Sequence, residues 1–169
     1  MANYCVINTD LMSGVKQPAD LVSLRFYGSD GKVAEVENGV IVKLVEYETG
    51  EREVFKAVAA TASDDIQDCA VVANPEVMYD ERKKNLEDYI NPAGKAIRGY
   101  RLRNNNTFSV TASGFVAAAP AKGGAVGVGT GGKIDSTGEG LGICSDIWMA
   151  GKRKFYAVQI DKRVTESEG

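Results

Sequence analysis

The fold is decided by residues 32–60, which read KVAEVENGVIVKLVEYETGEREVFKAVAA. Asn38 and Gly39 suit the two positive-φ positions of a type I′ turn, and the residues after this pair alternate between two faces. The pattern predicts a hairpin between residues 33–37 and 40–47. A second turn, in the sequence ETG, returns the chain into a third strand, so the stretch as a whole predicts a β-meander.

Further strands are expected on both sides of this meander. Their signals are runs rich in β-branched and aromatic residues, bounded by turn-forming residues. One short helix is expected between them, because residues 80–90 place apolar side chains on one face and Asn91 with Pro92 ends the pattern. The predicted strands outside the meander cover residues 21–27, 69–73, 96–102, 107–111, 143–149 and 154–160.

The sequence predicts a mainly β fold, a small barrel or sandwich with a β-meander and one short helical insertion near residues 75–90. Residues 1–20 are expected to form an N-terminal arm, because the segment before the first strand is polar and aperiodic. The mainly β domain is expected over residues 21–163. Within it, residues 112–133 are rich in Gly and Ala and are expected to form a loop. Residues 164–169 are polar and are expected to fray.

Composition excludes several classes of function. The chain has 169 residues, enough for one domain with a core of its own. It has no histidine, so the usual base of Ser and Cys triads and the commonest transition-metal ligand are missing. The three cysteines, Cys5, Cys69 and Cys144, are scattered and predict buried thiols in a reducing compartment. We expect no enzyme, no catalytic residue, no cofactor and no metal site.

Charge and hydropathy bear on the partners. The formal net charge is −3, from 20 Lys and Arg against 23 Asp and Glu, and this balance disfavours binding to a polyanion. No run approaches the roughly 18 consecutive apolar residues of a membrane span, and the first residues lack the pattern of a signal peptide. We therefore expect synthesis in the cytoplasm, with neither nucleic acid nor membrane as a partner.

A glycine-rich motif raises the alternative of a nucleotide-binding module. Gly127, Gly129 and Gly132 satisfy the G-x-G-x-x-G spacing, and Lys133 follows them. A phosphate-binding loop also needs a helix N-terminus directly after it. The sequence continues instead with IDSTG, residues 134–138, so a plain glycine-rich loop is favoured and nucleotide binding is the weaker alternative.

A basic stripe is interleaved with Tyr100 and consists of Lys95, Arg98, Arg101 and Arg103; the other concentration of positive charge is at residues 152–154. A nucleic-acid site would stack Tyr100 on a base. Alternation along a strand, however, divides the cations between two faces. A solvated strand, or a patch that meets an acidic protein partner, is therefore favoured over a nucleic-acid site.

Three segments carry a resemblance to a known family: ENGVIVKLVEYETGEREVFKA (37–57), ANPEVMYDERKKNLEDYINPAGKAIRGYRL (73–102) and FSVTASGF (108–115). Together they resemble small virion proteins of tailed phages and prophages of Gram-positive bacteria, the capsid decoration or cement proteins. The phrase NTDLMSG (8–14) is similar to the same group. The resemblance spans about half of the chain, and residues from 117 onward take no part in it.

The resemblance implies a structural role without catalysis. A decoration protein binds the exterior of a phage head and stabilises the shell by bridging neighbouring capsomers. The implied partner is the major capsid protein, with self-association on the capsid surface as a further expected contact, and the implied location is the outside of the virion. Another virion assembly component, of the tail or the connector, is the first alternative.

Two parts of the chain are expected to contact the partner. Residues 2–20 would pack along the capsid surface and add a strand to an exposed sheet edge through backbone hydrogen bonds. The basic stripe would meet acidic groups. The residues expected to bind the partner are Asn8, Leu11, Met12, Lys16, Arg98, Tyr100, Arg101 and Arg103.

Overall fold

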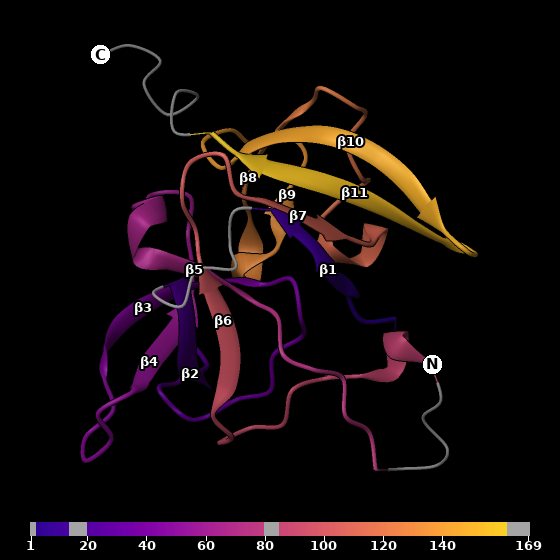
Figure 1. The fold of residues 1–169 in the computed structure, drawn as a ribbon. Helices are drawn as coiled ribbons and strands as arrows, with labels where there is room; N and C mark the ends of the chain where they lie inside the picture. The colour runs from indigo at the N-terminus through magenta and orange to yellow at the C-terminus, as the bar shows by residue number, and fades with distance from the viewer. Residues whose placement is uncertain (1–2, 14–19, 80–84, 162–169) are drawn as a thin grey trace, which may run out of the picture.

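The computed structural model describes residues 3–13, 20–79 and 85–161. Within these residues the protein is mainly β, with helical structure limited to short 3-10 turns, which confirms the predicted fold class. The strands form two units, a closed five-stranded barrel and a six-stranded sheet drawn above it in Figure 1. None of the described helices is long and apolar enough to cross a membrane.

The barrel is built from strands of the first part of the chain. Its order is β2-β4-β3-β5-β6, and the pairing of β6 with β2 closes it. Neighbouring strands are antiparallel except β2 and β4, which run parallel. As a result, β2 and β4 begin, and β3 and β6 end, at the same end of the barrel. The barrel strands are β2 (Leu21–Tyr27), β3 (Ile41–Tyr47), β4 (Val54–Ala59), β5 (Cys69–Val72) and β6 (Ile97–Arg101).

Alternation along the strands fills the barrel interior with small and branched apolar residues. Val40, Val42 and Leu44 lie on the inner face, as the sequence pattern predicts, and belong to one core cluster with Leu24 and Ala57. A small barrel has room inside for side chains only. The interior is therefore a packed core, and any binding site must lie at its ends or on its outside.

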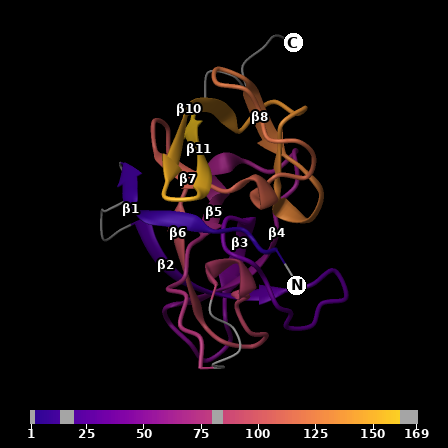
Figure 2. The same ribbon diagram turned by 90° about the vertical axis from the view of Figure 1, so that its right-hand side faces the viewer.

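The second unit is a sheet with the order β1-β7-β11-β10-β8-β9, antiparallel throughout. β10 and β11 form a long hairpin that extends beyond the rest of the molecule on the right of Figure 1. Figure 2 shows this sheet and the barrel from the side, turned by 90°. The sheet strands are β1 (Ile7–Ser13), β7 (Thr107–Val110), β8 (Ala125–Val128), β9 (Ile134–Asp135), β10 (Gly142–Ala150) and β11 (Arg153–Ile160).

β5 is buried on both faces and joins the two units. Ala70 and Val72 belong to the barrel core. Cys69 and Val71 point the other way, into a second core that includes Phe108 of the sheet. Burial of both faces explains why this strand reads as a continuous apolar run and not as an alternating one.

The structure confirms most of the predicted strands. β2, β5, β6, β7, β10 and β11 lie where the sequence predicts them, within one residue at each end. The predicted turn in residues 48–50 joins β3 to β4, with Gly50 at a φ of 84°. The Gly- and Ala-rich residues 112–133 form β8 and two short 3-10 turns, η4 (Ala112–Gly114) and η5 (Thr130–Gly132).

The predicted hairpin at Asn38 and Gly39 is wrong. β3 pairs with β4 and β5, whereas the segment before Asn38 makes only isolated bridges, such as that of Val36 with Asn91. Gly39 has the expected positive φ of 83°, but its N–H donates to the carbonyl oxygen of Val72. The Asn38 side chain is buried and hydrogen-bonded to Asn91 at 3.0 Å. These contacts with distant parts of the chain decide which segments the turn connects.

The helical insertion predicted near residues 75–90 is a 3-10 turn in its described part. Residues 80–84 lie outside the described residues, and η3 (Leu86–Asp88) follows. Tyr89 leaves this turn with an extended backbone, φ −83° and ψ 130°, and its side chain is buried. Burial of the Tyr89 side chain therefore favours the extended backbone over the helix that the weak apolar pattern predicts. A further 3-10 turn, η2 (Ile66–Asp68), precedes β5.

Part of the segment predicted as an N-terminal arm belongs to the sheet. Cys5 and Ile7 are buried, and β1 pairs with β7, with Ile7 opposite Val110. The physical reason is that the apolar residues 5–7 are buried, and Ile7, the last of them, begins the strand that pairs with β7, far along the chain. Residues 14–19 of the predicted arm and 164–169 of the predicted tail lie outside the described residues.

Candidate functional site

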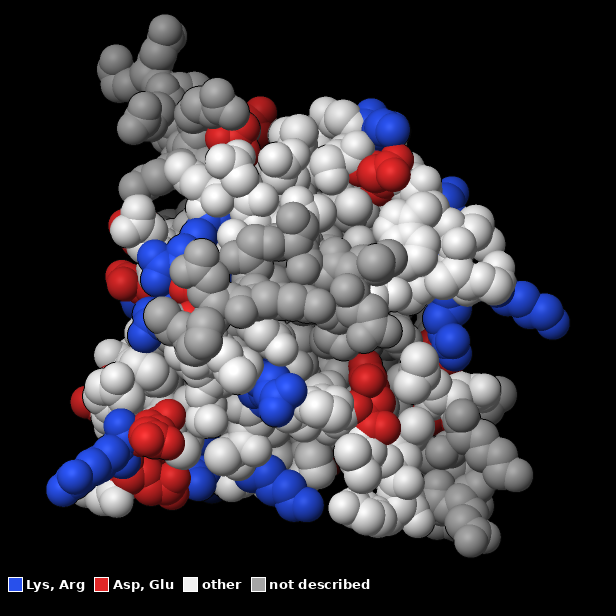
Figure 3. All heavy atoms as spheres, viewed as in Figure 1, with Lys and Arg blue, Asp and Glu red and all other residues white. Residues whose placement is uncertain are grey.

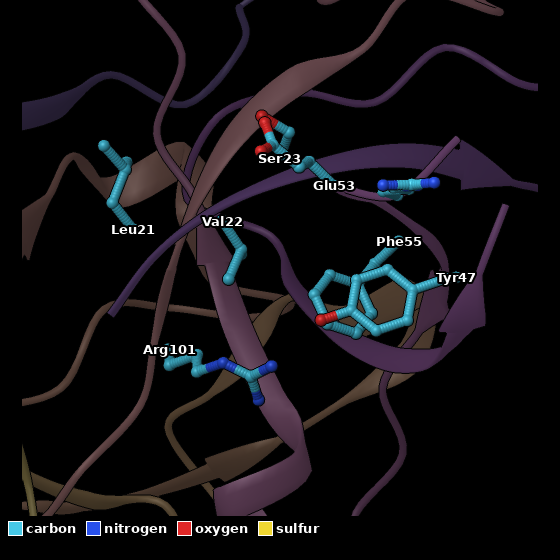
Figure 4. Close-up of a pocket in the computed structure, with 8 residues that line it drawn as sticks. Leu21, Val22, Ser23, Tyr47, Glu53, Phe55 and Arg101 are labelled. Atoms are coloured by element: carbon cyan, nitrogen blue, oxygen red, sulfur yellow. The ribbon is translucent and has the colours of Figure 1, made fainter. Parts of the chain in front are cut away.

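One end of the barrel opens to the surface in a pocket of about 360 Å³, which we call the barrel-mouth pocket (Figure 4). It lies where β2 and β4 begin and β3 and β6 end, so four strands of a closed barrel hold its walls. Side chains from these strands and from the β3–β4 turn line it. The lining residues are Leu21, Val22, Ser23, Tyr47, Arg52, Glu53, Phe55 and Arg101.

Two stacked aromatic rings form one side of this pocket. Tyr47, at the end of β3, stacks on Phe55 of β4 with ring centroids 4.2 Å apart and planes inclined by 29° (Figure 4). A β-bulge between Leu44 and Glu46 makes this contact possible. Residues after a bulge change faces, so Tyr47 lies opposite Phe55 and not on the outer face that regular alternation predicts. Tyr47 is 57% exposed, so much of its ring is accessible to a partner.

Two arginines supply the positive charge of the pocket. Arg101 lies with its Cζ atom 5.1 Å from the centre of the Phe55 ring, a cation–π distance. Arg52 lies on the β3–β4 turn and is exposed. Neither guanidinium forms an ion pair with a carboxylate of the described residues. Glu53 is the acidic member of the lining, so two arginines against one glutamate leave a net charge of +1.

This combination of groups is suited to binding. Aromatic rings and arginine are the residue types that dominate the energy of protein interfaces. The stacked rings can cover an apolar side chain, and a guanidinium can pair with a carboxylate through two hydrogen bonds. The barrel-mouth pocket can therefore hold an apolar or aromatic side chain that lies next to an acidic one.

The structure divides the predicted basic stripe among different places. Arg101 lines the barrel-mouth pocket, whereas Arg98 is exposed and lines another pocket. Tyr100 packs against the core between the two units. Arg103 donates a hydrogen bond from its Nε to the carboxylate of the buried Asp20. The expected division of charge between faces is therefore found, and one of the four predicted residues belongs to the pocket.

Three of the four predicted N-terminal residues lie in the other unit. Asn8 is on β1, opposite Ser109 of β7. Leu11 and Met12 are also on β1, and Lys16 lies outside the described residues. Asn8 is not among the residues that line the barrel-mouth pocket.

The remaining pocket residues carry no signal in the sequence that marks them as a site. Alternation from Val40 onward predicts that Tyr47 lies on the outer face, and no residue type near Leu44 and Glu46 predicts the bulge between them. Arg52 and Glu53 belong to a hydrophilic run that is typical of a solvated turn. Phe55 reads as an ordinary strand residue.

The glycine-rich motif forms a packed turn between two strands. β8 leads into η5, and β9 begins directly after Lys133. A Cβ atom on Gly132 would lie 2.2 Å from the carbonyl oxygen of Ile41, and the φ of Gly132 is 76°. Glycine at this position allows the turn to pack closely against β3. A strand therefore stands where a phosphate-binding loop has its helix.

Some of the ionisable groups outside these pockets have structural roles. The Nζ of Lys43 donates a hydrogen bond to Asp64 at 2.6 Å, which holds the pKa of this carboxyl below its ordinary value. The cysteines are buried and free, and burial raises the pKa of Cys5 and Cys69 to about 12. Over residues 3–13, 20–79 and 85–161, no group of His, Cys, Asp and Glu side chains is arranged to hold a metal ion.

Comparison with known proteins gives no relative. No protein-family model, curated protein or solved structure matches this chain. The site is therefore interpreted from its own geometry.

Proposed function

We propose that this chain is a capsid decoration, or cement, protein that binds the exterior of a tailed-phage head and stabilises it. Its partner is the major capsid protein, and its place is the outer surface of the virion. Two observations support this function. Residues 37–57, 73–102 and 108–115 resemble such proteins, and the barrel presents a pocket with the composition of a protein-binding hot spot.

The barrel-mouth pocket is the observation that carries this function. Tyr47 presents an exposed ring that is already stacked on Phe55, so binding would immobilise few additional rotamers. Arg101 is held beside the same ring and is available to a carboxylate of the partner. Strands of a closed barrel position all three groups. This geometry is suited to docking on a fixed protein surface such as a capsid lattice.

The surface charge agrees with a protein partner. On the face that Figure 3 shows, Lys and Arg are interspersed with Asp and Glu, and the chain has a net charge of −3. A protein that wraps DNA needs clustered cations that displace counterions from phosphates. The charge pattern therefore favours a position on the outside of the shell, away from the genome.

Co-sedimentation with phage heads tests this function. Heads would be produced from the genome that encodes the chain, with the gene for the chain deleted, and mixed with purified protein. We expect the wild-type protein to pellet with the heads. Tyr47→Ser and Arg101→Glu should each raise the apparent Kd about tenfold or more, because each removes a central group of the pocket.

Matched controls come from the β10–β11 hairpin. Met149→Ser and Lys152→Glu change exposed apolar and basic residues there, and both variants should bind as the wild type does. Attachment that the two pocket variants leave unchanged would exclude the barrel-mouth pocket as the docking site. Failure of the wild-type protein to pellet with heads would contradict the function, and pelleting with tails alone would favour the tail component.

A further inference from the structure

A second pocket, of about 350 Å³, lies between the segment that follows β5 and the start of β6. We call it the Tyr79 groove. It shares no lining residue with the barrel-mouth pocket, so the two sites are separate. The residues that line the groove are Asn74, Pro75, Val77, Tyr79, Tyr89, Pro92, Lys95, Ala96, Ile97 and Arg98.

A buried network of amide groups holds the walls of this groove. The Oδ1 of Asn38 accepts hydrogen bonds from the N–H of Asn74 and the Nδ2 of Asn91, both at 3.0 Å. The Tyr89 hydroxyl accepts from the Nδ2 of Asn74 at 3.0 Å and donates to the Oδ1 of Asn91 at 2.9 Å. The backbone N–H of Arg98 donates to the Oδ1 of Asn74 at 3.1 Å. Because these groups bond to one another, the groove is held in shape before any partner binds.

The groove exposes large apolar side chains. Tyr79 is 90% exposed and Val77 is 57% exposed. Pro75 and Pro92 add further apolar surface to the same lining. Exposed apolar side chains that gather beside a pocket with a polar rim are typical of interaction sites.

Among the described residues, the two charged side chains that line the groove are both positive. Lys95 and Arg98 are exposed, and neither forms an ion pair with a carboxylate of the described residues. The nearby Glu76 accepts a hydrogen bond from the Nδ2 of Asn38 at 3.3 Å. Two available cations beside an apolar wall are complementary to a segment that carries both carboxylates and apolar side chains.

We propose that the Tyr79 groove binds an extended acidic segment of a protein partner. An apolar or aromatic side chain of this segment packs against Tyr79 and Val77, and its carboxylates pair with Lys95 and Arg98. A strand of nucleic acid is less suited to the described part of the groove, because it requires a continuous cationic track and a series of stacking rings. The separate lining makes this binding independent of attachment to a capsid through the barrel mouth.

Fluorescence anisotropy tests this proposal. The probe is a short fluorescein-labelled peptide in which Asp and Glu alternate with Leu and Phe. A matched peptide carries Lys in place of every acidic residue, and labelled oligothymidylate reports binding of nucleic acid. We expect saturable binding of the acidic peptide only, and we expect this binding to weaken as the salt concentration rises.

Substitutions in the groove locate the binding. Tyr79→Ser and Arg98→Glu should each weaken binding of the acidic peptide about tenfold. Both replace exposed side chains, so the midpoint of urea unfolding should stay at the wild-type value. Met149→Ser and Lys152→Glu change an exposed apolar and an exposed basic residue of the β10–β11 hairpin and should leave binding of the peptide unchanged. Tyr47→Ser and Arg101→Glu report any binding of the peptide at the barrel mouth.

Three results would overturn the assignment of the groove. The first is no saturable binding of the acidic peptide, and the second is a preference for the oligonucleotide. The third is weaker binding in the barrel-mouth variants with full binding in the groove variants.

Discussion

Tyr47 stacks on Phe55 across the mouth of the barrel, with ring centroids 4.2 Å apart. The contact exists because the bulge between Leu44 and Glu46 changes the face of β3 on which the tyrosine lies. Tyr47 is still 57% exposed, so its ring is held in place without being buried. A ring held in this way contributes little to folding and offers a large surface to a partner.

Tyr47→Ala should lower the free energy of unfolding by about 0.5–1.5 kcal/mol, which is the range for one aromatic pair. Leu24→Ala is the comparison, because Leu24 is fully buried in the barrel and its truncation leaves a cavity that should cost about 3 kcal/mol. Urea unfolding followed by circular dichroism measures both values. Equal losses in the two variants would make Tyr47 a structural residue and would argue against a docking role.

Regular alternation makes most of the barrel predictable from sequence, and the bulge makes its mouth unpredictable. Val40, Val42 and Leu44 lie in the barrel core as their spacing predicts. The alternation of faces along β3 then breaks at the bulge, where the sequence has no turn-forming residue, glycine or proline that would predict it. Tyr47 therefore reads as an outward-facing residue in the sequence and lines the pocket in the structure.

The turn at Asn38 and Gly39 shows a second limit of local sequence patterns. The composition correctly predicts a positive φ at Gly39. It cannot show that the Asn38 side chain is hydrogen-bonded to Asn74 and Asn91, because these residues lie far along the chain. A turn is encoded locally, whereas the strands that it connects depend on such distant contacts.

Asn91→Ala should lower the free energy of unfolding by about 3 kcal/mol, because it leaves several buried polar groups unpaired. The Nδ2 of Asn91 donates to the carbonyl oxygen of Val36 and to Asn38, and its Oδ1 accepts from Tyr89. Asn85→Ala is the control, since Asn85 is exposed and makes no side-chain capping bond; its effect should stay within about 0.5 kcal/mol. Equal urea midpoints for the two variants would show that the network does not stabilise the fold.

The ion pair between Glu87 and Arg153 ties η3 to β11 and should make stability depend on pH. Arg153 donates two hydrogen bonds to the carboxylate, at 2.5 and 3.1 Å. This pairing holds the pKa of Glu87 below its ordinary value. A lowered pKa means that the stabilisation is complete above the ordinary pKa and is lost as the pH falls through the folded-state pKa.

Glu87→Gln should therefore lower the free energy of unfolding by about 0.5–1 kcal/mol at neutral pH, since both partners of the pair are partly exposed. The difference from the wild type should shrink as the pH is lowered from neutral to acid, because the carboxyl becomes protonated as the pH falls through its lowered pKa. Urea unfolding at neutral and at acid pH measures this change. Glu139→Gln, at an exposed position, should match the wild type at both, and a Glu87→Gln deficit that persists in acid would disprove the linkage.

The cysteines should not react with iodoacetamide in the folded protein. Burial raises the pKa of Cys5 and Cys69 to about 12 and also raises the pKa of Cys144, so little thiolate forms near neutral pH. Intact mass after labelling should show no adduct in buffer and three in denaturant. Ser29→Cys adds an exposed thiol and should gain one adduct in buffer. Rapid labelling of the native wild-type protein would contradict the buried positions.

The sequence predicts that the arginines of the basic stripe lie on different faces, but it does not predict which pockets they line. Strand alternation predicts that Arg98 and Arg101 do not share one face, and the structure places them in separate pockets. The groups that complete each pocket come from other segments, Phe55 in one and Tyr79 in the other. The spacing along the strand predicts that the two arginines lie on opposite faces. Which residues surround each of them is seen only in the folded structure.

Cryo-electron microscopy of virions with and without this chain tests the proposed function most directly. We predict additional density on the exterior of the head when the chain is present, with the end of the barrel that carries Tyr47 and Arg101 against the capsid protein. Identical head maps in the two preparations, or additional density at the tail or connector only, would contradict the assignment.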